Sequence, residues 1–201
     1  ICSNGTRVFV AASIKDKFLN LLIEKTQRMK VGNPMDSSTD VGALISKEHF
    51  SKVLDYMELG KQEAKLLFGG ERVDFEEGSP LSNGCFVQPT IFDCESDDLR
   101  IVKEEIFGPV MSVLTFEDED EVIARANDTE FGLAAGVFTA DLDRAERVVN
   151  QLEAGVCWIN TYNITPVELP FGGYKQSGIG RDLGPEQLVH FLQVKTVIMQ
   201  L

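Results

Sequence analysis

Between residues 111 and 159 the sequence alternates between patterns typical of strands and patterns typical of helices. Strands are predicted at residues 111–116, 135–138 and 155–159, and helices at 119–126 and 142–152. Such alternation is typical of a parallel sheet with helices on both faces. The sequence therefore predicts an α/β protein with a mostly parallel sheet.

The first half of the chain adds further elements of the same kinds. Strands are predicted at residues 8–11, 65–68 and 87–92. Two helices are predicted to begin at Ser13 and Ser46, since serine is a favoured N-cap residue. Asp16 would complete a capping box after Ser13, and Ile45 would pack against Phe50 as a hydrophobic staple.

The end of the chain predicts a short helix at residues 185–192 and a terminal strand at 196–201. A strand at the end of a chain leaves one edge unpaired, and such an edge can pair with another domain or subunit. We therefore expect this strand to pair with another domain or subunit.

Composition excludes several classes of protein. With 43% hydrophobic and 25% charged residues, the 201-residue chain is expected to be globular. The net charge of −13 argues against nucleic acid as a partner. Apolar runs are too short to span a membrane. The four cysteines form no CxxC pair and show no metal-ligand spacing, which suggests free thiols in a reducing, cytoplasmic compartment.

Cys2 differs from the other cysteines in its surroundings. A single cysteine is more often an inert buried thiol than a nucleophile. Cys2, however, precedes the small and polar pair Asn4-Gly5, which would allow an exposed thiol, whereas Cys157 lies in a predicted strand. Cys2 is therefore a candidate nucleophile.

Three further stretches contain residues of the kinds found at binding sites. The glycines of residues 178–184 resemble a dinucleotide fingerprint, but their spacing is wrong and no strand precedes them, so a turn is the better interpretation. Residues 103–110, KEEIFGPV, place carboxylates and a ring near the end of an element, where a ligand could reach them. A solvated acidic turn is the alternative. Residues 170–178 form a loop rich in glycine and aromatic residues.

Five segments, in this order and at these separations, resemble the C-terminal part of an NAD(P)-dependent aldehyde dehydrogenase. They are ICSNGTRVFV, KEEIFGPVMSVLTFED, ANDTEFGLAAGVFT, AGVCWINTYN and LPFGGYKQSGIGRDLG. Within the family, TYNITPVELPFGGYKQSG most resembles the branch that acts on trimethylammonium aldehydes, the betaine aldehyde and 4-trimethylaminobutyraldehyde dehydrogenases.

The resemblance implies a role for the candidate nucleophile. Cys2 falls on the family's catalytic cysteine, which adds to an aldehyde to give a thiohemiacetal. Hydride transfer to NAD, or to NADP, leaves a thioester that water cleaves to the carboxylic acid. The backbone N–H of Cys2 would stabilise the oxyanion.

The resemblance also assigns binding residues. It implies that Glu105 holds the nicotinamide ribose and that Phe107 lies beside the nicotinamide, with Lys52 and His49 near the adenosine ribose.

Other positions would form the substrate and ion sites. The resemblance implies that Tyr162 and Phe171 contact the substrate, Tyr162 through a cation-π contact with the quaternary ammonium group. Trp is common at the position of Tyr162 in betaine aldehyde enzymes, which leaves the choice of aldehyde open. The backbone carbonyls of Lys175 and Gly178 fall where some relatives bind a structural potassium ion.

The resemblance divides the chain into a catalytic domain at residues 1–183 and a tail at 184–201 that holds the oligomerisation strand of a homodimer or homotetramer. The family's general-base glutamate, oxyanion asparagine and cofactor domain precede the nucleophile. We therefore expect these 201 residues to be the N-terminally truncated catalytic portion of the enzyme and to be inactive alone.

Two other hypotheses stay open. A non-catalytic module would keep the fold and the associating edge without the chemistry. A related acyl-transferring or semialdehyde enzyme would keep Cys2 but differ in the group that cleaves the thioester. Selective alkylation of Cys2 near neutral pH would favour a catalytic protein over the module.

Overall fold

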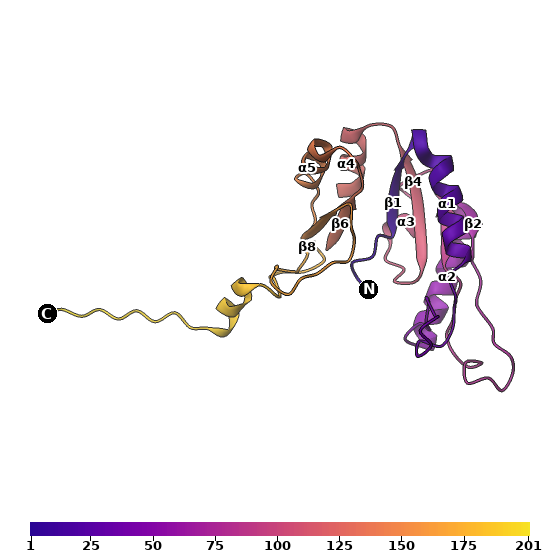
Figure 1. The fold of residues 1–201 in the computed structure, drawn as a ribbon, viewed down its shortest axis with the longest axis horizontal. Helices are drawn as coiled ribbons and strands as arrows, with labels where there is room; N and C mark the ends of the chain where they lie inside the picture. The colour runs from indigo at the N-terminus through magenta and orange to yellow at the C-terminus, as the bar shows by residue number, and fades with distance from the viewer. The chain divides into compact units, whose positions relative to one another are not determined.

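The computed structural model describes all 201 residues, which form two compact units (Figure 1). The first unit consists of residues 5–125 with Ile1, and the second consists of residues 2–4 and 126–201. Both units combine strands with helices, so the predicted α/β class is confirmed.

The first unit is built on a four-stranded sheet in the order β1-β4-β3-β2. Its strands are β1 (Arg7–Ala11), β2 (Lys65–Phe68), β3 (Thr90–Asp93) and β4 (Val110–Phe116). β4 pairs in parallel with both β1 and β3, and only β2 is antiparallel. The sheet is therefore mostly parallel, as the sequence predicts.

Helices pack on both faces of this sheet. Those in contact with it are α1 (Lys15–Gln27), α2 (Lys47–Glu63) and α3 (Arg100–Lys103). The 3₁₀ helix η1 (Ala12–Ile14) precedes α1, and α4 (Glu119–Asn127) follows β4. Leu19 of α1 packs with Ile91 and Val113, whereas Met57 of α2 packs with the neighbouring strand residues Phe92 and Leu114. Because successive strand residues point to opposite faces, α1 and α2 lie on opposite sides of the sheet.

The starts of the two long helices differ from each other. Ser46 caps α2 as predicted, because its Oγ accepts a hydrogen bond from the His49 N–H at 3.1 Å. The predicted cap at Ser13 is wrong: Ser13 lies inside η1, and Ile14 precedes α1 without a side-chain cap. The predicted staple is also wrong, since Ile45 is 90% exposed.

The second unit contains two pairs of strands. β6 (Ala134–Val137) and β7 (Val156–Ile159) are parallel and are connected through α5 (Leu142–Val149). Asp141 caps α5 by accepting a hydrogen bond from the Arg144 N–H at 3.0 Å. The predicted strand-helix-strand unit is confirmed, although α5 ends three residues earlier than expected.

The second strand pair was not predicted. It consists of β5 (Phe131–Gly132) and β8 (Tyr174–Lys175), which are antiparallel and only two residues long. Strands of this length carry no recognisable alternation of apolar and polar residues.

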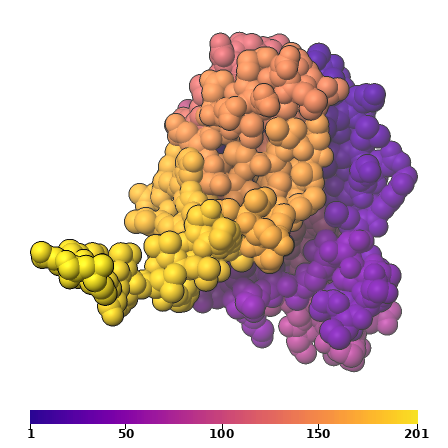
Figure 2. Space-filling view, turned by 60° about the vertical axis from the view of Figure 1, so that its left-hand side comes forward, coloured from indigo at the N-terminus to yellow at the C-terminus, as the bar shows by residue number.

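The chain ends in the 3₁₀ helix η2 (Pro185–Phe191) followed by residues without regular structure. The predicted strand at residues 196–201 is absent. A strand requires a hydrogen-bonded partner, and the apolar side chains of this segment are exposed, Ile198 to 91%. Figure 2 shows this end of the chain, in yellow, as a narrow extension of the second unit. No helix in the structure combines the length and the apolar character required to cross a membrane.

Candidate active site

Glu105 and Phe107 lie on a short segment between α3 and β4, in the first unit. Ile106 between them is buried in the core and is 6% exposed, whereas Phe107 is 44% exposed. Phe107 has a φ of 58°, a conformation that is rare for an aromatic residue. Anchored by Ile106, the segment presents a carboxylate and a ring to solvent two residues apart.

Helix α2 holds the backbone of this segment through His49 and Lys52. His49 Nε2 donates to the Phe107 carbonyl at 2.7 Å, and Lys52 Nζ donates to the Glu105 carbonyl at 2.9 Å. Residues three apart lie on one face of a helix, so the Ser46 cap, which starts α2, sets the place of both donors. The structure thus brings together all four residues that were assigned to the cofactor, and His49 and Lys52 contact the other two directly.

Gly108 allows the close approach of the segment to α2. A Cβ at this position would lie 2.8 Å from Cγ1 of Val53, which is fully buried. Any other residue would therefore push the segment away from the helix or displace a core side chain.

A further contact joins α2 to the residue before Glu105. Tyr56 Oη donates to Glu104 Oε2 at 2.5 Å, and Arg100 binds both carboxylate oxygens, with Nε 2.8 Å from Oε1 and an Nη 3.0 Å from Oε2. The hydrogen bond from Arg100, then that from Tyr56, lowers the pKa of Glu104 to about 2. The same bond to Glu104 raises the pKa of Tyr56.

In the second unit Cys2 is exposed on a turn that Asn163 holds. Ser3 Oγ donates to Asn163 Oδ1 at 2.7 Å, and Asn163 Nδ2 donates to Asn4 Oδ1 at 2.6 Å. Ser3 is buried, so the turn is fixed from within while the Cys2 side chain stays accessible. The role of Asn163 could not be predicted from the sequence. Its only local signal is that asparagine tolerates positive φ, here 57°.

Tyr162 precedes Asn163 and packs against Trp158. The two ring centroids are 4.7 Å apart at 45°, and a Cβ on Gly136 would lie 2.7 Å from the Tyr162 ring. The ring is half-buried, and desolvation is the main cause that raises the pKa of Tyr162. An aromatic ring next to the residue that holds the Cys2 turn is suited to contact a substrate.

Phe171 and the potassium candidates lie later in the second unit. Phe171 exchanges two backbone hydrogen bonds of 2.7 Å with Asp182 and is half-buried. Lys175 ends β8, and Gly178 follows the turn at residues 176–177. Lys175 Nζ binds the Asn127 carbonyl at 2.6 Å. These contacts involve only groups of the chain itself. The substrate role of Phe171 and the potassium site therefore stay predictions.

The glycine-rich stretch at residues 178–184 contains bends and turns and no α-helix, in agreement with its interpretation as a turn. The helix that follows, η2, is a 3₁₀ helix of seven residues. A phosphate loop requires a strand-turn-helix unit, which this segment lacks.

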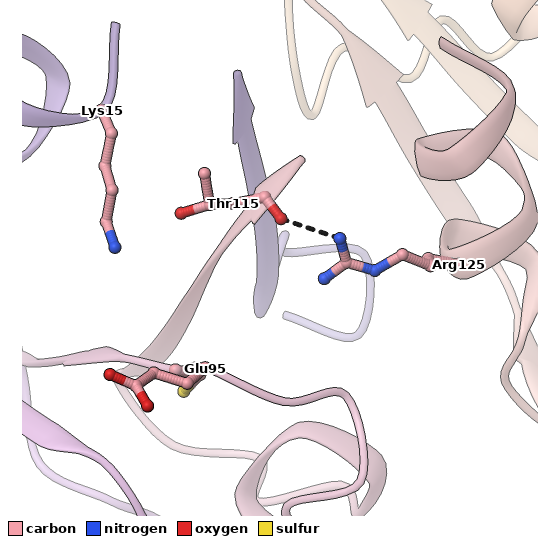
Figure 3. Close-up of a pocket in the computed structure, with 5 residues that line it drawn as sticks. Lys15, Glu95, Thr115 and Arg125 are labelled. Carbon is pink, nitrogen blue, oxygen red and sulfur yellow. Dashed lines mark hydrogen bonds between the residues drawn. The ribbon is translucent and has the colours of Figure 1, made fainter. Parts of the chain in front are cut away.

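A separate cavity of about 350 Å³ in the first unit is lined by Lys15, Cys94, Glu95, Thr115 and Arg125 (Figure 3). Both of its cations are paired. Lys15 Nζ lies 2.8 Å from Asp93, and Arg125 binds Asp97 as well as the Thr115 carbonyl. None of the residues expected in the active site lines this cavity. Its two cations are thus neutralised by carboxylates outside the lining, which is the arrangement of structural ion pairs.

Comparison with known proteins identifies relatives along the whole chain. The model of the aldehyde dehydrogenase family matches residues 1–197. A betaine aldehyde dehydrogenase from Brucella anthropi is 55% identical over 201 residues, which is 100% of this chain and 41% of that protein. A betaine aldehyde dehydrogenase from Brucella ovis gives the same values. The chain thus spans about two fifths of the length of these curated relatives.

Solved structures show the same fold. Apo betaine aldehyde dehydrogenase from Staphylococcus aureus superposes with a TM-score of 0.91 at 45% identity, over 97% of this chain and 38% of that chain. The same enzyme in complex with NAD⁺ gives a TM-score of 0.89 at 45% identity, over 95% and 38%.

Proposed function

Because the chain belongs to the aldehyde dehydrogenase family, we propose that Cys2 is the nucleophile in the NAD-dependent oxidation of an aldehyde to a carboxylic acid. The observation that carries this proposal is the Cys2 thiol itself, which is exposed at the start of a turn fixed by Asn163. The other three thiols are buried or half-buried.

The chemistry follows from the groups around Cys2. Its thiolate adds to the aldehyde carbon, and the new oxyanion accepts a hydrogen bond from the backbone N–H of Cys2. Loss of hydride from that carbon gives a thioester, and attack by water releases the acid and restores the thiol. NAD, when bound, supplies the acceptor for the hydride.

The first unit fits the nicotinamide end of that cofactor. An exposed carboxylate suits the hydroxyl groups of a ribose, and an exposed ring suits the face of a flat heterocycle. Glu105 and Phe107 offer both groups on a segment whose backbone is held by His49 and Lys52. In this arrangement Lys52 and His49 support the cofactor site through the backbone, in addition to the contact with the adenosine ribose that the sequence predicts.

The proposed substrate is a trimethylammonium aldehyde such as betaine aldehyde. It is supported by the names of the relatives that are 55% identical and by Tyr162, which is held beside the Cys2 turn through its neighbour Asn163. A cation-π contact with a quaternary ammonium group contributes about 1–2 kcal/mol when it is desolvated. Phe171 would add a second aromatic contact.

The remaining expectations belong to the same proposal. We place the enzyme in the cytoplasm as a homodimer or homotetramer that associates through residues 184–201, where apolar side chains such as Ile198 are exposed. A potassium ion would be bound by the carbonyls of Lys175 and Gly178.

The test compares Cys2→Ala with Cys85→Ala in the protein that carries this chain, purified from its source organism. NADH formation from betaine aldehyde should vanish in Cys2→Ala and persist in Cys85→Ala, because Cys85 is a buried thiol far along the sequence from the turn. Equal activity of the two variants would refute the proposal.

A further inference from the structure

We propose that Tyr56, Glu104 and Arg100 form a clamp that positions Glu105 and Phe107 for the nicotinamide cofactor. The three are positioning residues, since each acts through the segment and none is assigned a contact with the cofactor. The inference rests on the proposed function, because the cofactor role of Glu105 and Phe107 is part of that proposal.

The clamp begins with a carboxylate that is bound from two elements. Glu104 accepts one hydrogen bond from Tyr56 on α2 and two from Arg100 at the start of α3. Two parallel bonds from a guanidinium fix a carboxylate in orientation as well as in distance. The residue immediately before Glu105 is therefore fixed to both helices.

The clamp completes a row of contacts along the segment. Glu104 is held by its side chain, Glu105 and Phe107 by their carbonyls, and Ile106 by burial. The side chains of Glu105 and Phe107 take no part in these hydrogen bonds. The contacts thus fix the backbone and leave both side chains exposed, with the Phe107 ring also in edge contact with the His49 ring at a centroid distance of 6.1 Å.

The ionisation states of the clamp residues preserve its hydrogen bonds across the ordinary range of pH. The groups that face Glu104 are Arg100 and Tyr56, which hydrogen-bond to it, and Lys52, and together they keep its pKa at about 2. The pKa of Tyr56 is raised, so its hydroxyl stays a donor. Near neutral pH the clamp therefore pairs an ionised acceptor with a neutral and a cationic donor.

Phe107 gives a physical reason for such close support. Its φ of 58° is unfavourable for a residue with a Cβ, and a residue holds such a conformation only where its surroundings determine it. Without the clamp the segment would relax, and the ring would lose its fixed place.

The test starts from Tyr56→Phe, which removes one hydroxyl group and keeps the ring. Hydrogen exchange of peptides that cover residues 104–110 should become roughly tenfold faster, the effect of losing one hydrogen bond to a charged group. The matched control is Tyr174→Phe, because no hydrogen bond of the Tyr174 hydroxyl occurs in the structure and its side chain is exposed. Exchange in residues 104–110 should not change in the control.

Kinetics distinguish positioning from a general loss of structure. In Tyr56→Phe the KM for NAD should rise by about 3- to 10-fold while the KM for betaine aldehyde stays unchanged. Partial unfolding would instead lower kcat and leave both KM values unchanged. A second variant, Glu104→Gln, should act in the same direction. Its control is Glu24→Gln, which changes another exposed Arg-Glu pair with the same spacing, formed with Arg28.

The outcomes separate the clamp from the proposed function. Faster exchange in both clamp variants together with a raised KM for NAD supports the proposal. Unchanged exchange in both variants overturns the clamp, whatever the activity. Faster exchange with an unchanged KM for NAD overturns the positioning role and the cofactor role of Glu105 and Phe107. Absence of any aldehyde-dependent NADH formation in the unmodified protein overturns the proposed function and leaves the exchange result valid.

Discussion

Ser3 donates a hydrogen bond to Asn163 across 160 positions of the sequence, with 2.7 Å between Ser3 Oγ and Asn163 Oδ1. The amide of Asn163 also donates to Asn4 at 2.6 Å. The turn that carries Cys2 is therefore fixed by a residue beside Tyr162, the proposed substrate contact. In this arrangement one asparagine links the turn of the proposed nucleophile to the ring that is proposed to contact the substrate.

We expect Asn163→Gly to lower kcat about tenfold, because a nucleophile that loses its fixed geometry loses rate. Glycine keeps the positive φ of 57° without backbone strain and removes the whole side chain, including the amide that binds Ser3 and Asn4. Steady-state kinetics with betaine aldehyde measure the effect.

The control for this variant is Asn160→Gly. Asn160 also has a positive φ, of 53°, but its side chain binds the backbone of Thr139. A kcat that falls equally in both variants would mean that Asn163 has no special relation to Cys2.

Thiol reactivity should distinguish Cys2 from the other cysteines. Burial raises the pKa of Cys94 to about 11 and also raises the pKa of Cys157, while Cys85 is buried. With limiting iodoacetamide near neutral pH, peptide mass mapping should find the label on Cys2 alone, since only a thiolate that reagent can reach reacts. Similar labelling of all four thiols in the native protein would contradict this assignment.

Gly60→Ala should destabilise the fold even though alanine favours helices. A Cβ at Gly60 would lie 2.5–2.9 Å from three ring atoms of Phe92, which is fully buried and has no room to move. Overpacking against three atoms of a fully buried ring costs about 2–3 kcal/mol, the upper part of the usual range, and the gain in helix propensity is about 1 kcal/mol. We expect a net loss of about 1–2 kcal/mol in the free energy of unfolding by urea.

Asp55→Ala is the control, because Asp55 is exposed on the same helix. Its effect should stay within about 0.5 kcal/mol. Unchanged or increased stability of Gly60→Ala would show that α2 and β3 are less closely packed than described.

The clamp predicts a defined dependence on pH. The folded pKa of Glu104, about 2, lies below its ordinary value of 4.5, so its contribution is present above pH 4.5 and is lost as the pH falls toward 2. The pKa of Tyr56 is raised above 10.0, so its contribution is complete below that pH and is lost only at higher pH.

Hydrogen exchange of residues 104–110, corrected for the intrinsic effect of pH, should therefore be constant between these limits and faster outside them. Glu104→Gln should lack the acidic transition. A transition near neutral pH in the unmodified protein would show that another group holds the segment.

Several elements could be predicted from local sequence because their signals are local. The strand-helix-strand unit of β6, α5 and β7 has regular patterns, and Ser46 caps α2 through a residue three positions away. Ser13 has a similar local pattern but lies within a 3₁₀ turn, which the pattern does not reveal. The strand predicted at residues 196–201 requires a partner that a single chain does not provide.

The residues of the candidate site also fall into those that the sequence reveals and those that only the fold reveals. Cys2, Glu105 and Phe107 could be proposed from the chain because they lie in long segments that resemble one family. Asn163 and Tyr56 could not, since each acts through hydrogen bonds to residues distant in sequence. Such contacts depend on the fold and leave no periodic pattern.

The central claim is that Cys2 forms the thioester. The most direct measurement is peptide mapping by mass spectrometry after an acid quench of the protein with betaine aldehyde and NAD. The account predicts an acyl group of the substrate on the peptide that contains Cys2, and none on that peptide in Cys2→Ser. An acyl group on another residue, or NADH formation at an undiminished rate in Cys2→Ser, would contradict it.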